Sequence, residues 1–442
     1  MKEDIGQLPR ELADHFTGPF LRFLRIEAMA GAVLFVCVVI ALSLANSGWA
    51  AQYFALWDTH FGFSWGNLGF TRSIQHWIND AAMTLFFFVV ALELKREMVL
   101  GELRDLKVAV MPLAGALGGM VFPVGLFLLL VGDAPSAAGW GTVMSTDTAF
   151  VIGCLALLGR RVPESLRLFL LALAIFDDIA AIAVVAVSYS GALQWVPLVL
   201  AASGFAIVMV AARIGIRSVP FYVVLGVGIW LAVDASGIHA TLTGVVLGLM
   251  TPARSWVSDD RLHAILDRVV AYPPGRHWSG DTVGRRDLQR AGVATREAMS
   301  PIERLEIALH PWIAFAVMPI FALANAGVTF VPATVDPALA TAIFLSFVVG
   351  KPVGIVVCCA LFVELKLAHR PSDLPWSTLT AGSLLAGIGF TMALFIGGLA
   401  FSPELIGSVK VGILAASLIS ASFGMLALRL LSVARVSTGA RI

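Results

Sequence analysis

The sequence predicts an all-α polytopic membrane protein with about twelve transmembrane helices. Apolar residues make up 59% of the 442, and the mean hydropathy is +0.89. Charged residues make up only 13%, about half of the roughly 25% found in ordinary soluble domains. A soluble chain of this composition would lack enough polar surface to cover itself, whereas a bilayer removes that need.

Twelve apolar stretches are long enough to cross, or nearly cross, the roughly 30 Å hydrocarbon core of a bilayer. They are residues 24–46, 75–96, 107–131, 137–159, 164–189, 194–212, 219–235, 238–252, 305–328, 338–364, 376–400 and 405–431. The seventh and eighth are short and meet at residues 237–239, so a count of eleven spans is also compatible with the sequence.

Three hydrophilic segments surround these spans. Residues 1–23 mix acidic and basic side chains before any apolar run begins, which is unlike a cleavable secretory signal; we expect a cytoplasmic interfacial helix there. Residues 253–304 are rich in Arg and Asp, and we expect a solvated cytoplasmic linker that could include one short helix. Residues 432–442 form a cytoplasmic tail, so the transmembrane domain covers 24–431.

Basic residues predict the orientation of the spans. With twelve spans, nearly all Lys and Arg between and beside them fall on one side, and the exceptions are Arg72 and Lys410. By the positive-inside rule that side, with both termini, is cytoplasmic. Residues 47–74 are then external, and the alternating pattern of 60–74 around Gly66-Asn67 predicts a small β-hairpin. A solvated outer loop is the alternative there.

Neither cofactors nor metal centres are indicated. Cys37, Cys154, Cys358 and Cys359 lie in apolar runs without metal-ligand spacing, so we expect buried thiols and neither a disulfide nor a zinc site. The net charge of +1 gives no indication of nucleic-acid binding.

Four charged residues lie near the middle of predicted spans. Asp177 and Asp178 are adjacent in the fifth, Asp147 is in the fourth beside Thr146, and Lys351 is in the tenth. Each costs at least about 2.5 kcal/mol at mid-bilayer, so charges there usually mark ion or proton pathways. Neighbouring helical residues point about 100° apart, so the two aspartates should have different partners. A purely structural ion pair with Lys351 is the alternative, but it would leave two acids unexplained.

Two spans carry polar or glycine-rich centres. The fourth has a Ser-Thr-Asp-Thr sequence at 145–148, and the eleventh has Gly387 and Gly389. Helices interrupted at matching places in two halves are typical of inverted-repeat transporters, whose ions bind at the breaks. Close packing of helices is the alternative reading of the glycines.

Several motifs together resemble the bacterial NhaA family of sodium/proton antiporters. They are AIFDDIAAI, STDTAFVIGCLALLG, WINDAAMTLFFFVVALELKREMVLGEL, SGIHATLTGVVLG, LHPWIAFAVMPIFALANAGV, GKPVGI and GIGFTMALFI. The resemblance extends from about residue 20 to 430, apart from the 253–300 loop. It implies inverted repeats with two broken, crossing helices.

The resemblance also implies roles for individual residues. Asp178 resembles the direct cation ligand, and Asp177 its proton-carrying partner that pairs with Lys351. Thr146 and Asp147 resemble residues beside the crossing of the broken helices, where Asp147 offsets the positive helix ends and assists the cation. Lys351 would offset the negative ends.

Further residues resemble family positions outside this site. Asp80 resembles a supporting acid of less defined role. Six residues resemble family positions linked to the pH response: Glu93, Arg96, Glu97, His239, Glu306 and His310. The chain departs from the family at Ile307, where some members carry a histidine, and in its longer 253–300 loop, and both departures concern the regulation of transport.

The resemblance therefore implies a secondary antiporter, not an enzyme, in a bacterial inner membrane. It would expel Na+ and Li+ in exchange for external protons, with pH regulation, electrogenic stoichiometry and a homodimer joined through the hairpin. A passive cation channel is one alternative, although it has little use for a midplane lysine. An intramembrane aspartyl protease is a remote second, because its two acids come from two spans and here Phe390 follows Gly389.

Overall fold

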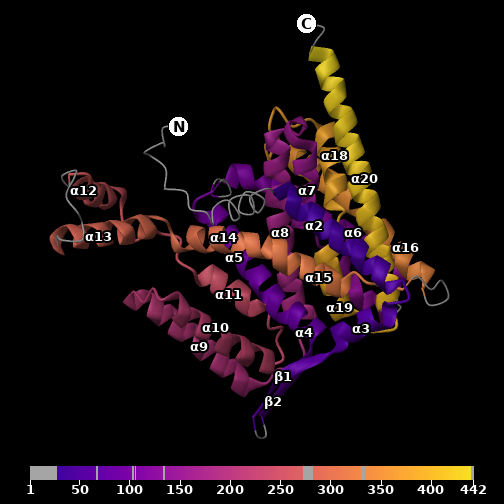
Figure 1. Ribbon diagram of the computed structural model, residues 1–442. Coiled ribbons are helices and arrows are strands. Elements are labelled where there is room, and N and C mark those ends of the chain that lie inside the picture. Colours follow the sequence, from indigo (N-terminus) through magenta and orange to yellow (C-terminus); the bar gives the residue numbers. More distant parts are fainter. Residues whose placement is uncertain are drawn as a thin grey trace. The chain divides into compact units, whose positions relative to one another are not determined.

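In the computed structural model the described part of the chain is mostly helical (Figure 1). The structure describes residues 27–65, 68–101, 104, 106–132, 135–271, 282–329 and 335–439. The described residues belong to two compact units: Met1–Met83, Leu106–Ser190 and Pro311–Ile442 form unit 1, and Thr84–Asp105 and Gly191–His310 form unit 2.

Unit 1 contains most of the long helices and the only strands among the described residues. Its elements are α2 (Glu27–Ala45), α3 (Ala50–Asp58), β1 (His60–Trp65), β2 (Leu68–Ser73), α4 (Ile74–Trp77), the π-helix η1 (Ile78–Ala82), α6 (Leu106–Val131), the 3₁₀ helix η3 (Pro135–Val143), α7 (Thr148–Leu158), η4 (Gly159–Arg161), α8 (Glu164–Ser188), the π-helix η5 (Ile313–Val317), α15 (Met318–Asn325), α16 (Pro337–Leu345), the π-helix η7 (Ser346–Gly350), α17 (Lys351–Glu364), α18 (Trp376–Ala386), α19 (Phe390–Ala400) and α20 (Ile406–Gly439).

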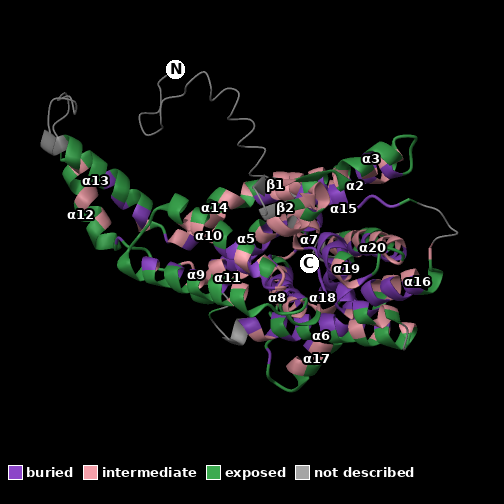
Figure 2. Ribbon diagram, turned by 90° about the horizontal axis from the view of Figure 1, so that it is seen from below, coloured by how far each residue is buried: buried purple, intermediate pink, exposed green. Residues whose placement is uncertain are grey.

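Unit 2 is a smaller helical group. Its elements are α5 (Met83–Val99), α9 (Trp195–Ile214), α10 (Val219–Ala235), α11 (Leu242–Met250), α12 (Asp259–Val270), α13 (Thr282–Ala298) and α14 (Pro301–Trp312), of which α5 begins and α14 ends in unit 1. Glycines bring α11 against α5, because a Cβ on Gly244 would overlap the backbone at Thr84. The apolar side chains of α9 are widely exposed, as Trp195 and Val196 show (Figure 2), and this is the surface that a helix presents to lipid.

The prediction of an all-α membrane protein is confirmed. Every one of the twelve predicted stretches contains helix, and seven helical segments among the described residues are long and apolar enough to cross a membrane. Counting each bent pair as one span raises this to ten. The remaining two stretches are α10, with 17 residues, and α11, with 9; the latter rises only about 14 Å, which explains why the seventh and eighth spans looked short.

Two of the bent pairs are the predicted interrupted helices. The axes of η3 and α7 differ by 41°, and those of α18 and α19 differ by 46°. The two pairs meet at their breaks, where the Asp147 amide donates to the Ile388 carbonyl at 2.6 Å. Buried residues gather on α8, α18 and α19 around this meeting point (Figure 2).

The packing of α17 against α6 fixes the position of Lys351. Gly118 and Gly354 face each other so closely that a Cβ on either would overlap the carbonyl of the other, which is how small residues bring membrane helices together. Lys351 is the first residue of α17, directly after the π-helix η7. Its side chain is completely buried. The π-helix before it is an irregularity of the kind that is frequent at functional sites.

The predicted hairpin is present as β1 and β2, which pair antiparallel from His60 opposite Ser73 to Trp65 opposite Leu68. Its expected turn at Gly66-Asn67 lies outside the described residues. So does the predicted interfacial helix at 1–23, whereas α20 continues through most of the predicted tail.

The long hydrophilic loop differs from expectation. It contains two helices, α12 and α13, which pack against each other, rather than one short helix. Both are strongly amphipathic, so each gives the other an apolar face to bury, as with Ala291 and Ala294 of α13. A criterion based on long apolar runs does not detect such helices, because their apolar residues are separated by polar ones.

Candidate functional site

The site is built on the Asp147 carboxylate, which lies between the starts of two helices. Asp147 is the residue before α7, and its Oδ1 accepts the Phe150 amide at 3.0 Å, as an N-cap does. Its Oδ2 accepts the Thr391 amide at 2.8 Å and also the Thr391 hydroxyl, in the first turn of α19. One buried carboxylate therefore offsets the positive ends of both half-helices.

Asp177 forms an ion pair with Lys351 in the interior of unit 1. Lys351 Nζ lies 3.2 Å from Asp177 Oδ2, and both side chains are 0% exposed. The Thr146 hydroxyl donates to the same oxygen at 2.5 Å. Asp177 Oδ1 has no hydrogen-bond partner among the described residues. Since such a buried oxygen is costly, it is a position where a proton or a cation lowers the free energy.

Asp178 faces a different neighbour from Asp177, as the turn of α8 requires. The Thr148 hydroxyl, at the start of α7, lies 3.2 Å from Asp178 Oδ2. Asp178 is 2% exposed. The two acids are thus separate groups on one helix, each beside a threonine of the broken segment.

Donors also cover the carbonyl ends of the two preceding half-helices. Lys351 Nζ donates to the Met144 carbonyl just beyond η3, and Thr146 Oγ1 lies 3.2 Å from the Ala386 carbonyl at the end of α18. The negative ends of η3 and α18 thus lie beside the Lys351 ammonium group and the Thr146 hydroxyl, respectively. The positive ends of α7 and α19 lie beside the Asp147 carboxylate. Lys351 therefore lies beside the carbonyl end of η3.

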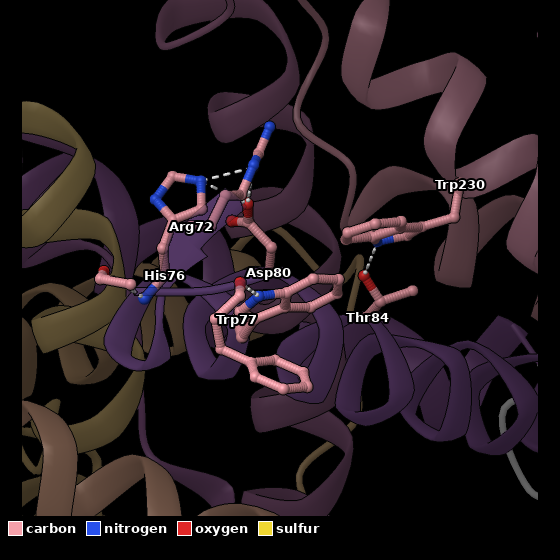
Figure 3. A network of polar contacts seen from close by, with 8 residues as sticks. Arg72, His76, Trp77, Asp80, Thr84 and Trp230 are labelled. Atoms are coloured by element: carbon pink, nitrogen blue, oxygen red, sulfur yellow. Dashed lines mark hydrogen bonds and ion pairs between the residues drawn. The ribbon is translucent and has the colours of Figure 1, made fainter. Parts of the chain in front are cut away.

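Asp80 lies in a second charged cluster of unit 1, outside this site (Figure 3). Its Oδ2 is 2.7 Å from Arg72 Nη1 of β2 and 2.9 Å from His76 Nε2 of α4. The Arg72 and His76 side chains also contact each other. Trp77 Nε1, one turn before, donates to the Phe61 carbonyl of β1 at 2.9 Å. These contacts attach the hairpin to the helix that follows it.

The residues expected to respond to pH all lie in unit 2. Arg96 pairs with Glu97 at 3.0 Å and with Glu306 at 2.9 Å. His310 and Ile307 are exposed, while Glu93 and His239 are half-buried. Three of the six predicted residues therefore form one ion-pair cluster on α5 and α14.

Two site residues were absent from the sequence prediction. Thr391 supplies both donors to Asp147 Oδ2, and Thr148 contacts Asp178. Each is a threonine within four residues of a helix break inside an apolar run, and this was the available signal, because such hydroxyls bond locally where backbone is interrupted. Gly387 and Gly389 lie in the break itself, and a Cβ on either would meet Phe347 of η7.

The donor set suits a hard monovalent cation. Carboxylate and hydroxyl oxygens converge here, and such ligands suit hard ions. Among the described residues no group of three or more His, Cys, Asp or Glu is arranged to hold a resident metal ion.

Comparison with known proteins agrees with these observations. The chain matches the Na+/H+ antiporter 1 family over residues 21–428. It is 63% identical over 432 residues to Na(+)/H(+) antiporter NhaA of Rhizobium meliloti (strain 1021), covering 98% of this chain and 99% of that protein. It is 53% identical over 425 residues to Na(+)/H(+) antiporter NhaA 1 of Acidiphilium cryptum (strain JF-5), covering 96% and 94%, and 48% identical over 426 residues to Na(+)/H(+) antiporter NhaA 2 of Vibrio vulnificus (strain CMCP6), covering 96% and 95%. The chain therefore belongs to the Na+/H+ antiporter 1 family.

Proposed function

We propose that this protein exchanges Na+ for H+ across a membrane at the Asp177 and Asp178 site. The observation that carries the proposal is the fully buried Lys351–Asp177 pair beside a second buried acid, at the meeting of two broken helices. Family membership and the names of the relatives support it. A passive channel gains nothing from a buried lysine at its binding site, and adjacent acids on one helix do not suit a protease.

The exchange follows from competition for the same oxygens. A buried carboxylate is costly unless a proton, a cation or an ion pair offsets its charge. Asp178 holds the cation together with Thr146, Asp147 and water, and Asp177 takes a proton when it leaves Lys351. Because either ion satisfies the site, proton binding expels the cation, and the site must open to the other side between the two events.

Several finer properties belong to the same proposal. Li+ is carried as well as Na+, since both are hard ions that favour oxygen ligands. With two acids available, more than one proton is exchanged per cation, and the membrane potential contributes to the driving force. The Arg96–Glu97–Glu306 cluster, together with Glu93, His239 and His310, adjusts activity to pH.

Localisation and assembly complete the proposal. Family membership supports a place in a bacterial inner membrane, and the basic loops favour both termini in the cytoplasm. The external hairpin has two strands and so leaves two edges, and it joins a second copy edge to edge in a homodimer. Asp80 supports the hairpin through Arg72.

Replacing Asp178 tests the site. In inverted vesicles loaded with a pH-sensitive dye, Asp178→Asn should abolish the proton movement that Na+ induces, because the amide lacks the charge that holds the cation. Asp267→Asn, at an exposed position on α12, is the matched control and should behave as wild type. Full Na+-dependent exchange by Asp178→Asn at wild-type protein levels would refute the assignment.

A further inference from the structure

The contact of the Thr148 side chain with Asp178 is not explained by capping of α7, and Thr148 is not among the predicted ligands. It is the first residue of α7, and its Oγ1 is 3.2 Å from Asp178 Oδ2. The N-cap duty at this position belongs to Asp147, whose carboxylate already accepts the Phe150 amide. Thr148 is therefore available for another task.

The two threonine–aspartate contacts of the site differ in length. Thr146 Oγ1 is 2.5 Å from Asp177 Oδ2, a strong hydrogen bond to a carboxylate. The Thr148–Asp178 separation of 3.2 Å exceeds the range of about 2.5 to 3.0 Å usual for hydroxyl donors. The Thr146 hydroxyl is thus held closely by Asp177, whereas the contact between Thr148 and Asp178 is the weaker of the two.

The longer spacing matches two oxygens that share a cation. Oxygen ligands of Ca2+ lie about 2.3 to 2.6 Å from the ion, so two ligands at a right angle are roughly 3.2 to 3.7 Å apart. Na+ has nearly the same ionic radius as Ca2+. The 3.2 Å between Thr148 Oγ1 and Asp178 Oδ2 therefore requires little movement when Na+ binds between them. A threonine hydroxyl has two lone pairs for this while its proton turns to water.

Exposure places Thr148 at the accessible edge of the site. Thr146, Asp147, Asp177 and Asp178 are each 2% exposed or less, whereas Thr148 is half-buried. A cation that reaches Asp178 along this edge meets a hydroxyl that replaces one water of its hydration shell.

We propose that Thr148 is a ligand of the transported cation and a residue that determines its specificity. This inference rests on the proposed Na+/H+ exchange and adds a member to its site. Thr148 Oγ1 and Asp178 Oδ2 take adjacent positions around Na+. Because the smaller Li+ is satisfied by fewer oxygens, the hydroxyl matters more for Na+ than for Li+.

The test compares cation dependence in variants of the full-length protein. In inverted vesicles, Thr148→Val should raise the apparent KM for Na+ roughly tenfold, as expected for one neutral ligand of about hydrogen-bond strength, and the KM for Li+ less. Thr148→Ser, which keeps the hydroxyl, should return both values to within about twofold of wild type. Thr142→Val is the matched control, since this buried threonine of η3 makes no hydrogen bond to either aspartate, and its KM values should be unchanged.

The outcomes separate this inference from the proposed function. An unchanged KM for Na+ in Thr148→Val, or a rise that Thr148→Ser also shows, would overturn the ligand role while wild-type exchange persists. Absence of Na+-dependent exchange in wild type would instead refute the proposed function. If Thr148→Val does not accumulate in the membrane, Thr148→Ala is measured in its place with the same expected result.

Discussion

Two carboxylates in unit 1, Asp177 and Asp80, each pair with a cationic side chain, yet their surroundings differ. Asp177 and Lys351 are both 0% exposed. Asp80 is 14% exposed, Arg72 is 24% exposed, and His76 shares the same carboxylate. Both pairs lie at π-helices, since Asp80 is within η1 and Lys351 follows η7. A position at a π-helix therefore does not distinguish the two pairs.

The two ion pairs should differ in their response when one of the two charged groups is neutralised or removed. A buried ion pair is expensive to form, and removal of one partner leaves an uncompensated charge. A pair near the surface is screened by water and contributes little. The buried pair must therefore respond to the loss of a proton or the arrival of a cation, whereas the Asp80 cluster can keep the hairpin attached whatever ion is being carried.

The largest effect should come from removing the buried lysine. Lys351→Met removes the cation that offsets the charge of Asp177 and the donor to the Met144 carbonyl. We expect a loss of about 3 to 5 kcal/mol in stability, measured by thermal unfolding in detergent, and at least a tenfold fall in Na+-dependent exchange.

A second substitution tests the reason for that loss. Asp177→Asn in the Lys351→Met background removes the uncompensated charge, so most of the lost stability should return. If the double variant were as unstable as Lys351→Met alone, the lysine would stabilise the fold by packing, and the contrast between buried and exposed pairs would not hold.

Most of the fold could be predicted from sequence, because lipid imposes simple length and composition requirements on helices. The 145–148 and 387–389 breaks were also visible, since glycine and polar residues are conspicuous in an apolar run. The sequence pattern could not predict which residues far apart in the chain contact each other. That Asp147 caps α19, 244 residues away, depends on how two breaks meet in space.

The residues missed at the site share a physical cause. Thr148 and Thr391 cost little in a membrane helix, because a hydroxyl can bond to its own backbone, so their place beside the helix breaks was the only signal that the sequence offered. The charged residues were noticed because each is expensive. The helices α12 and α13 were not predicted because their segment is polar overall. Such a loop was expected to stay solvated, without two helices that pack against each other.

An intermediate effect should follow from removing the hairpin. His60 and Ser73 are opposite each other in the register, so a Gly-Gly link can replace residues 61–72 without stretching the chain. We expect a shift from dimer to monomer in detergent sizing, with exchange largely preserved, because the pairing edge is lost while the Asp177 site is untouched. Thr71→Ala, at an exposed position of β2 that keeps both strands, is the control and should remain dimeric. Dimers of unchanged size in the deletion would contradict the proposed assembly.

The smallest effect should come from Asp80→Asn, which is the direct counterpart of the change at the buried pair. The amide still accepts a hydrogen bond from Arg72, and water screens the remaining charge. We expect a loss of no more than about 1 kcal/mol in stability and a maximal Na+-dependent exchange rate within about threefold of wild type. Thermal unfolding and dye dequenching, run beside Lys351→Met, give the comparison. If Asp80→Asn matched Lys351→Met in both measurements, burial would not be what separates an ion pair that takes part in transport from one that holds the hairpin in place.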